Sequence, residues 1–254
     1  MTPAISSTTL SIANFRAAPD DMVPVFNAGD RSRPLIVRRM AQARRMRLSV
    51  DPRGGTVQLI LPRRTAMRAA LAWVEERRGW IEEQLAILPP STPITPDALI
   101  MIEGVPLRID WQPGASRTIH RMPDRLTVGG PLESLSSRIL RWLKREAQAV
   151  LEQETREIGR QAGVTIGRVG VGDPRSRWGS CSSAGDVRYS WRLILAPPDV
   201  RRATVAHEVA HRLHMDHSAA FHEAAARLFG RDPAPERRWL RQHGPSLHWL
   251  GRDG

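Results

Sequence analysis

The sequence predicts an α+β protein, because short alternating strands and amphipathic helices occupy separate stretches of the chain. Three observations support this class: strand-like runs separated by turn residues in the first half, a long helical period in the middle, and extended runs followed by capped helices in the last third. The 254 residues are enough for one large domain or two small ones. We expect an N-terminal portion of antiparallel strands and helices at 34–130 and a second portion at 131–250.

The chain starts with a segment that shows no sustained hydrophobic period. Residues 1–33 collect Ser, Thr, Pro, Asp and Gly, and because this composition is polar and turn-rich we expect a poorly ordered arm. The runs that follow, at 35–39, 45–50 and 56–61, are short and partly alternating, with turn residues at 51–55 between the last two. They predict a small antiparallel sheet.

A helix is expected next, with Thr65 as its cap and Pro89-Pro90 as its end. Its apolar residues recur at helical spacing: Ala69, Ala70, Trp73, Val74, Trp80, Ile81 and Leu85. We expect Trp73 and Trp80 to belong to the core rather than to stack on nucleic acid.

Strands are expected again near 105–110, 117–121 and 125–128, around a second turn. The period then changes to that of a long amphipathic helix over 136–160, which Gly163 closes. The middle of the chain therefore joins a second group of short strands to one long helix.

The last third is expected to hold two extended runs, at 165–171 and 187–195, with a loop over 173–181 between them. Three helices should follow: one over 200–213 with Asp199 as N-cap, one from Ser218 to Phe229, and a short one opened by Pro235.

The positive net charge of the chain suggests nucleic acid as a partner but supports it only weakly. The net charge is +12, and a basic surface attracts phosphates non-specifically. Of the 38 basic residues only Lys144 is a lysine, and the arginines are spread over the whole chain rather than clustered. Nucleic acid therefore stays a weakly supported partner.

Cysteine usage and hydropathy indicate a cytoplasmic protein. The single cysteine, Cys181, allows no intramolecular disulfide, which fits a reducing compartment. The N-terminus has neither a basic n-region nor a continuous apolar stretch, and nowhere do about 18 apolar residues run together. We expect neither export nor a membrane partner.

The expected helix at 200–213 carries a metal-binding pattern. His207 and His211 are four residues apart, so their side chains lie one turn apart on one face and can bind the same ion. Glu208 follows the first histidine and is placed to take a proton from water at the metal. Imidazole donors favour zinc, so the pattern predicts a Zn²⁺ site.

A catalytic zinc keeps three protein ligands and one open position, so a third ligand must come from outside the pair. His217 is our choice, because a turn between two helices can bring it back over the metal. His214 is the main alternative, although on a continuing helix it would diverge from the direction of His207. Weaker alternatives are Asp216, His222 and Glu223.

Residues before this helix suggest a substrate cleft. Trp178 to Cys181 could line it, with the next strand offering an edge to an extended peptide, or these side chains could simply pack. Tyr189 and Arg192 are possible oxyanion stabilisers, although core positions are expected for strand residues. Cys181 as a zinc ligand in a latent form is a minor alternative.

Four segments together resemble the YgjP-like metallopeptidase family, which is related to the SprT-like and WLM zinc peptidases. The matching segments are Ser176-Arg177-Trp178-Gly179-Ser180-Cys181-Ser182, Trp191-Arg192-Leu193-Ile194-Leu195-Ala196-Pro197, His207-Glu208-Val209-Ala210-His211 with His217-Ser218 and Phe221, and Trp239-Leu240. The resemblance covers roughly residues 35–241. It differs from the family pattern at Ser190 and Asp216, where the family has Asn.

The resemblance implies a zincin-like catalytic core in residues 131–250. It implies that His207, His211 and His217 bind zinc and that Glu208 is the general base. The spacing from the first to the third histidine equals that of metzincins, but His214 stands at their glycine position, and no methionine follows Met215 to form a Met-turn.

The function expected from these patterns is zinc-dependent hydrolysis of peptide bonds, with a peptide or protein as substrate. One alternative is a metal-dependent nucleotide phosphohydrolase, which no phosphate-cradling glycine loop supports. Another is a DNA-associated protease or a basic nucleic-acid-binding module, to which the net charge points.

Overall fold

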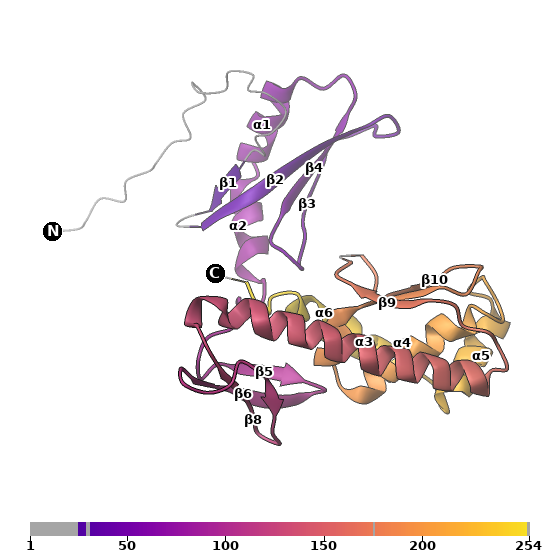
Figure 1. The fold of residues 1–254 in the computed structure, drawn as a ribbon. Coiled ribbons are helices and arrows are strands. Elements are labelled where there is room, and N and C mark those ends of the chain that lie inside the picture. The colour runs from indigo at the N-terminus through magenta and orange to yellow at the C-terminus, as the bar shows by residue number, and fades with distance from the viewer. Residues whose placement is uncertain (1–24, 29–30, 175, 253–254) are drawn as a thin grey trace. The chain divides into compact units, whose positions relative to one another are not determined.

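The computed structural model describes residues 25–28, 31–174 and 176–252 (Figure 1). The chain forms two compact units, one from residues up to 51 together with 55–88, and one from 52–54 together with the residues after 88. Both contain helices and small sheets, so the α+β class is confirmed. The expected portions at 34–130 and 131–250 divide the chain at a different residue and stay a prediction.

The first unit contains a four-stranded sheet with the order β1-β2-β4-β3. Its strands are β1 (Val25–Ala28), β2 (Arg31–Met40), β3 (Arg47–Val50) and β4 (Val57–Pro62). The expectation of an antiparallel sheet is wrong for one pair, because β2 and β4 are parallel while the other two pairs are antiparallel. The cause is that β4 lies between β2 and β3 instead of at the end of the sheet.

The arm expected over residues 1–33 is too long. Its first 24 residues lie outside the described part of the chain, but Val25–Ala28 is a strand that pairs with the start of β2. Phe26 explains the difference, since its ring is buried in the core of this unit and the Arg78 guanidinium lies over it at 4.7 Å.

The helix expected after residue 65 is two helices, α1 (Met67–Glu75) and α2 (Arg78–Ala86). The helix breaks at Arg77, whose backbone leaves the α region with φ −107° and ψ 16°. Thr65 is not the cap, because the N-cap is Ala66, without a side-chain hydrogen bond. Trp73 packs against the core as expected, whereas Trp80 is 41% exposed.

The second unit begins with another mixed sheet, of order β5-β6-β8-β7. Its strands are β5 (Leu99–Ile102), β6 (Val105–Gln112), β7 (His120–Arg121) and β8 (Arg125–Gly129). β6 and β8 are parallel and the other pairs are antiparallel. β5 was not expected, since its four residues are all apolar and show no alternation in the sequence, although alternate side chains are buried.

The long helix is confirmed as α3 (Leu135–Gln161), which Gly163 follows with a φ of +67°. One stripe of α3 is buried along its length, as the helical period predicts. The buried residues are Leu135, Ile139, Trp142, Leu143, Ala147, Leu151, Thr155, Ile158 and Gly159.

A three-stranded sheet of order β10-β11-β9 follows, formed by β9 (Val169–Gly172), β10 (Gly179–Cys181) and β11 (Val187–Ser190). Two expectations are corrected here. Part of the loop at 173–181 is the strand β10, which pairs antiparallel with β11. The second extended run stops at residue 190, because Trp191–Leu195 forms a 3₁₀ helix with buried side chains. Ser190 caps this helix, since its hydroxyl accepts a hydrogen bond from the Arg192 N–H.

Three helices complete the unit: α4 (Pro198–Ala210), α5 (Ala219–Phe229) and α6 (Ala234–Leu247). Asp199 lies in the first turn of α4 rather than at its N-cap, which is Pro197. The Ser218 hydroxyl caps α5 as expected, and Gly230 ends it with a φ of 95°. No helix in the described part of the chain is both long enough and apolar enough to cross a bilayer.

A buried arginine ties α4 to its neighbours. Arg201 is 4% exposed, and its guanidinium bonds to the carboxylates of Glu154 on α3 and of Glu103 in the turn between β5 and β6. Such a buried charge is tolerated because both partners pair with it. The helix that bears the HExxH pattern is therefore held from two sides.

Candidate metal centre

The HExxH histidines lie at the C-terminal end of α4. His207 is in the last turn of the helix, and His211 is its C-cap residue, still with helical backbone angles of φ −63° and ψ −17°. The helical spacing between them is therefore kept although α4 ends at Ala210. Both side chains project from one helix face, as the sequence predicts.

The segment after α4 brings the third histidine back toward this face. The Asp216 carboxylate accepts a hydrogen bond from the Ser218 N–H at 3.2 Å, and the Ser218 hydroxyl accepts one from the Phe221 N–H at 3.4 Å. These two turns fix the backbone on either side of His217 before α5 starts. The return expected at this position is present.

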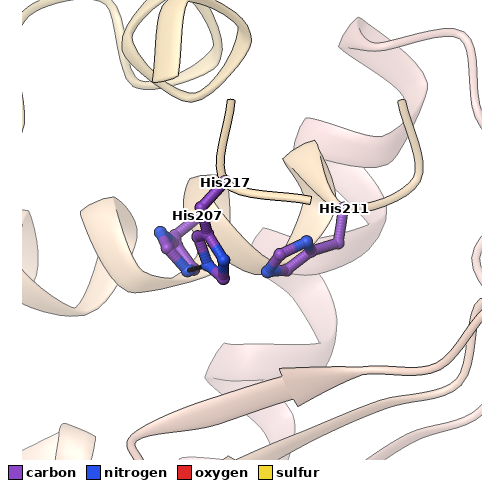
Figure 2. A group of neighbouring side chains, drawn as sticks. All are labelled: His207, His211 and His217. Carbon is purple, nitrogen blue, oxygen red and sulfur yellow. Dashed lines mark hydrogen bonds between the residues drawn. The ribbon is translucent and has the colours of Figure 1, made fainter. Parts of the chain in front are cut away.

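The three imidazoles converge in space. Each of His207, His211 and His217 offers one nitrogen, and these atoms all lie within 4.8 Å of one another. The Nε2 atoms of His207 and His217 are 3.4 Å apart, and Figure 2 shows the His211 ring directed at the same region. His214 contributes its backbone carbonyl instead, which lies 3.2 Å from Nδ1 of His211.

That carbonyl determines the tautomer of His211. A carbonyl oxygen only accepts, so Nδ1 of His211 must carry the proton and donate it to the His214 oxygen. The Nε2 atom of His211 then keeps its lone pair. Histidines that bind a metal through one ring nitrogen commonly donate a hydrogen bond from the other nitrogen, which fixes the orientation of the ring.

A buried phenylalanine supports all three rings. Phe221 of α5 is fully buried, and its ring centroid lies 4.8 Å from those of His207 and His217 and 4.5 Å from that of His211. Close-packed aromatic contacts restrict the rotamers of the imidazoles. The nitrogens of the three candidate ligands are thus held in position before any metal binds.

Burial favours the neutral form of the His207 and His211 imidazoles. Burial, and then the neighbouring His211 and His217, lower the pKa of His207 to about 4, and burial also lowers the pKa of His211. Both rings are therefore uncharged at neutral pH. An uncharged imidazole is the form that binds a metal ion.

Glu208 lies in α4 with its carboxylate against strand β10. The residue is 5% exposed, and burial raises its pKa to about 7, against the opposite effect of the Arg177 charge. Gly179 of β10 makes the close approach possible, because a Cβ there would lie 2.5 Å from Oε1 of Glu208. A carboxylate with this pKa is suited to proton transfer.

A cavity of about 250 Å³ opens beside Glu208 and His207. Its other lining residues come from the end of the segment before β10, from the first residue of β10, from α4 and from the region of α6. They are Arg177, Trp178, Gly179, Val200, Ala203, Thr204, Pro233, Glu236, Arg237 and Leu240. The candidate metal ligand and the candidate base therefore share one concave site.

Other residues considered from the sequence have structural surroundings. The Tyr189 hydroxyl lies 3.0 Å from the Thr155 hydroxyl in the core, and the buried Arg192 guanidinium bonds to the Asp173 carboxylate and the Leu247 carbonyl. Neither lines the cavity. Cys181 is not part of the histidine group, and burial raises the pKa of its thiol.

The expectation that the strand after the loop offers a free edge is wrong. β11 is the middle strand, with β9 on one side and β10 on the other. β10 is the edge strand of this sheet, and Gly179 in it lies against Glu208. The prediction failed because residues 179–181 were expected to form a loop and not a strand.

The histidine cluster fits zinc in its donor set, and one pair of its nitrogens also has the spacing of zinc ligands. Two nitrogens bound tetrahedrally at about 2.0–2.1 Å from zinc lie about 3.4 Å apart. The Nε2 atoms of His207 and His217 have this separation, at 3.4 Å. Imidazole nitrogens, one of them on a ring with a fixed tautomer, are also ligands that zinc prefers.

Sequence patterns missed several residues of the cavity. Trp178 and Gly179 line it, as the sequence suggested, but nothing in the local sequence of Arg237, which also lines it, relates this residue to residues 207–211. Leu240 was noted only as part of a segment that resembles the family. Arg177 was noted only as part of the segment that resembles the family. A long-range contact between α4, β10 and α6 brings these residues together, and a single sequence carries no direct signal for it.

The comparisons with known proteins agree with this geometry. The YgjP-like family, described as a metallopeptidase domain, matches residues 44–243. No curated protein and no solved structure is significantly similar to the chain. The match spans all three histidines and Glu208, part of the first compact unit and most of the second, and the chain therefore belongs to the YgjP-like metallopeptidase family.

Proposed function

We propose that this protein is a zinc-dependent peptidase. The observation that carries the proposal is the convergence of the imidazoles of His207, His211 and His217 beside a cavity that Glu208 lines. Three histidines are a donor set that leaves zinc an open position for chemistry. The family assignment supports peptide bonds as the target.

The roles of the residues follow from their surroundings. When bound, zinc supplies Lewis acidity and lowers the pKa of water. Glu208 accepts a proton from the attacking water on a carboxylate oxygen, and later donates it to the amine nitrogen of the leaving group. Its burial against β10 keeps this carboxylate in place and raises its proton affinity.

The edge of β10 suggests how an extended peptide would lie. The backbone carbonyl of Trp178 accepts a hydrogen bond from the Ser190 N–H, and the backbone N–H of Ser182 donates one to the Asp186 carbonyl. Trp178 and Ser182 therefore have backbone groups that face β11. By the alternation of an antiparallel pair, the backbone groups of Gly179 and Cys181 face the outer edge. A substrate strand could pair with them next to Glu208.

Metal removal tests the proposal directly. Zinc-loaded protein is expected to cleave a quenched-fluorescent peptide library, to lose this activity on treatment with a chelator, and to regain it when zinc is restored. The assay measures the fluorescence released over time. In parallel, the release of phosphate from a panel of nucleotides tests the alternative that the protein is a nucleotide phosphohydrolase.

The outcomes separate the two reactions. Zinc-dependent peptide cleavage without phosphate release supports the peptidase. Zinc-dependent release of phosphate, with every peptide left intact, would show that the metal centre acts on nucleotides and that the proposal is wrong.

A further inference from the structure

The cavity next to the metal centre has a charge pattern that the proposed reaction does not use. Two arginines line it from different elements, Arg177 just before β10 and Arg237 in α6. The same cavity is lined by His207 and Glu208, so any group bound there lies next to the candidate reaction centre. The question is which part of a substrate these guanidiniums would contact.

Both guanidiniums are available for a ligand. Among the described residues, Arg177 has neither an ion pair nor a hydrogen bond to a side chain, and it is exposed. Arg237 pairs with Asp232 only at 3.9 Å, and the Asp232 side chain is 75% exposed. An exposed pair at this distance contributes little and does not neutralise the cation.

The two carboxylates that line the cavity have another partner or another role. Oε1 of Glu236 pairs with the Arg231 guanidinium at 2.6 Å, while its buried Oε2 has no hydrogen-bond partner among the described residues. Glu208 is the other carboxylate, and its proposed role is proton transfer. The two arginines are therefore left to meet an anionic group from outside.

Between these charges the cavity is apolar. Its wall includes Trp178, Val200 and Leu240, and Trp178 is held by close contact with α6, where a Cβ at Gly244 would lie 2.6 Å from the indole ring. A volume of about 250 Å³ accommodates one amino-acid side chain with part of its backbone.

We propose that this cavity is a substrate subsite that selects a residue bearing a carboxylate, which Arg177 and Arg237 bind. Guanidinium groups match a carboxylate with paired, charge-assisted hydrogen bonds. The carboxylate can come from an internal Asp or Glu side chain or from the C-terminus of a peptide. The inference rests on the proposed peptidase function and names the substrate class of that same site.

Peptide binding to zinc-loaded Glu208→Gln protein tests the subsite without turnover. The probes are heptapeptides of alanine that carry an uncharged fluorescent label, with Glu, Gln or Lys at the centre and a free or an amidated C-terminus, and the readout is fluorescence anisotropy. We expect carboxylate-bearing probes to bind about tenfold more tightly than the neutral, amidated Gln probe. Arg177→Gln and Arg237→Gln should each reduce this preference.

Arg241→Gln is the matched control, because it removes the same charge from α6 at an exposed residue that does not line the cavity. Zinc content and thermal unfolding should be equal in all variants. A preference for Glu at the centre identifies the side chain as the source, and a preference for the free C-terminus identifies the peptide end.

Three results would overturn the inference. These are equal binding of acidic and neutral probes, a preference that both arginine variants retain, and no measurable binding of any probe. Arginine-dependent binding together with intact peptides in the wild-type assay would instead contradict the peptidase reaction and leave the subsite supported. The two proposals therefore fail in distinguishable ways.

Discussion

Replacement of Glu208 by glutamine is expected to lower kcat for peptide hydrolysis by about 10²–10⁴-fold, which corresponds to about 3–5 kcal/mol in the barrier. Glutamine keeps the size of the side chain, so it still fits against Gly179 of β10, but it cannot accept the proton of the attacking water. Zinc content should not change, because Glu208 is not one of the three converging residues.

The measurement compares initial rates of zinc-loaded proteins on one peptide substrate. Glu223→Gln is the control, since this carboxylate is exposed on α5 and does not line the cavity. It should retain the wild-type rate. A Glu208→Gln protein as active as the wild type, with zinc bound, would show that another group moves the proton.

Replacement of His217 by alanine is expected to weaken zinc binding by more than about 10²-fold. Loss of a residue that only hydrogen-bonds to a metal ligand already lowers metal affinity by about 10–100-fold. The change leaves two ligands on α4 and removes the nitrogen that lies 3.4 Å from Nε2 of His207. Peptidase activity should be lost with the metal. Competition with a fluorescent zinc chelator measures the dissociation constant.

His214→Ala is the matched control for this change. His214 acts on the cluster through its backbone carbonyl, which alanine keeps, so zinc affinity should remain near that of the wild type. Loss of zinc from His214→Ala with retention by His217→Ala would reverse the choice between these two residues.

Local patterns predicted the helices well because their signals are local. The periodicity of α3 and the capping hydroxyl of Ser218 are properties of neighbouring residues, and the structure agrees with both. The break at Arg77 was missed, because the apolar spacing continues across it and Gly79, two residues further on, was not taken as the sign of a break.

Strand pairing was predicted less well, because it depends on contacts between distant residues. Nothing in the sequence of β2 shows that it pairs in parallel with β4, or that Gly179–Cys181 adds an edge strand to β11. The alternation of a strand predicts which side chains are buried but not which neighbour it has.

For the candidate site, too, local sequence predicted some residues, while the others depend on contacts between distant parts of the chain. His207, Glu208 and His211 follow from helical spacing, and His217 follows from the expected turn and from the resemblance to the family. Phe221 as the shared support of the imidazoles, and Arg237 across the cavity, depend on how α5 and α6 pack against α4. Their roles became visible only in three dimensions.

The central claim is that three imidazoles hold one zinc ion, and X-ray absorption at the zinc edge of the loaded protein tests it most directly. We expect a first shell of three nitrogens and one further nitrogen or oxygen, at about 2.0–2.1 Å. His217→Ala should reduce the imidazole signal. A sulfur at about 2.3 Å, which Cys181 would have to supply, or a shell with fewer than three imidazoles, would contradict the account.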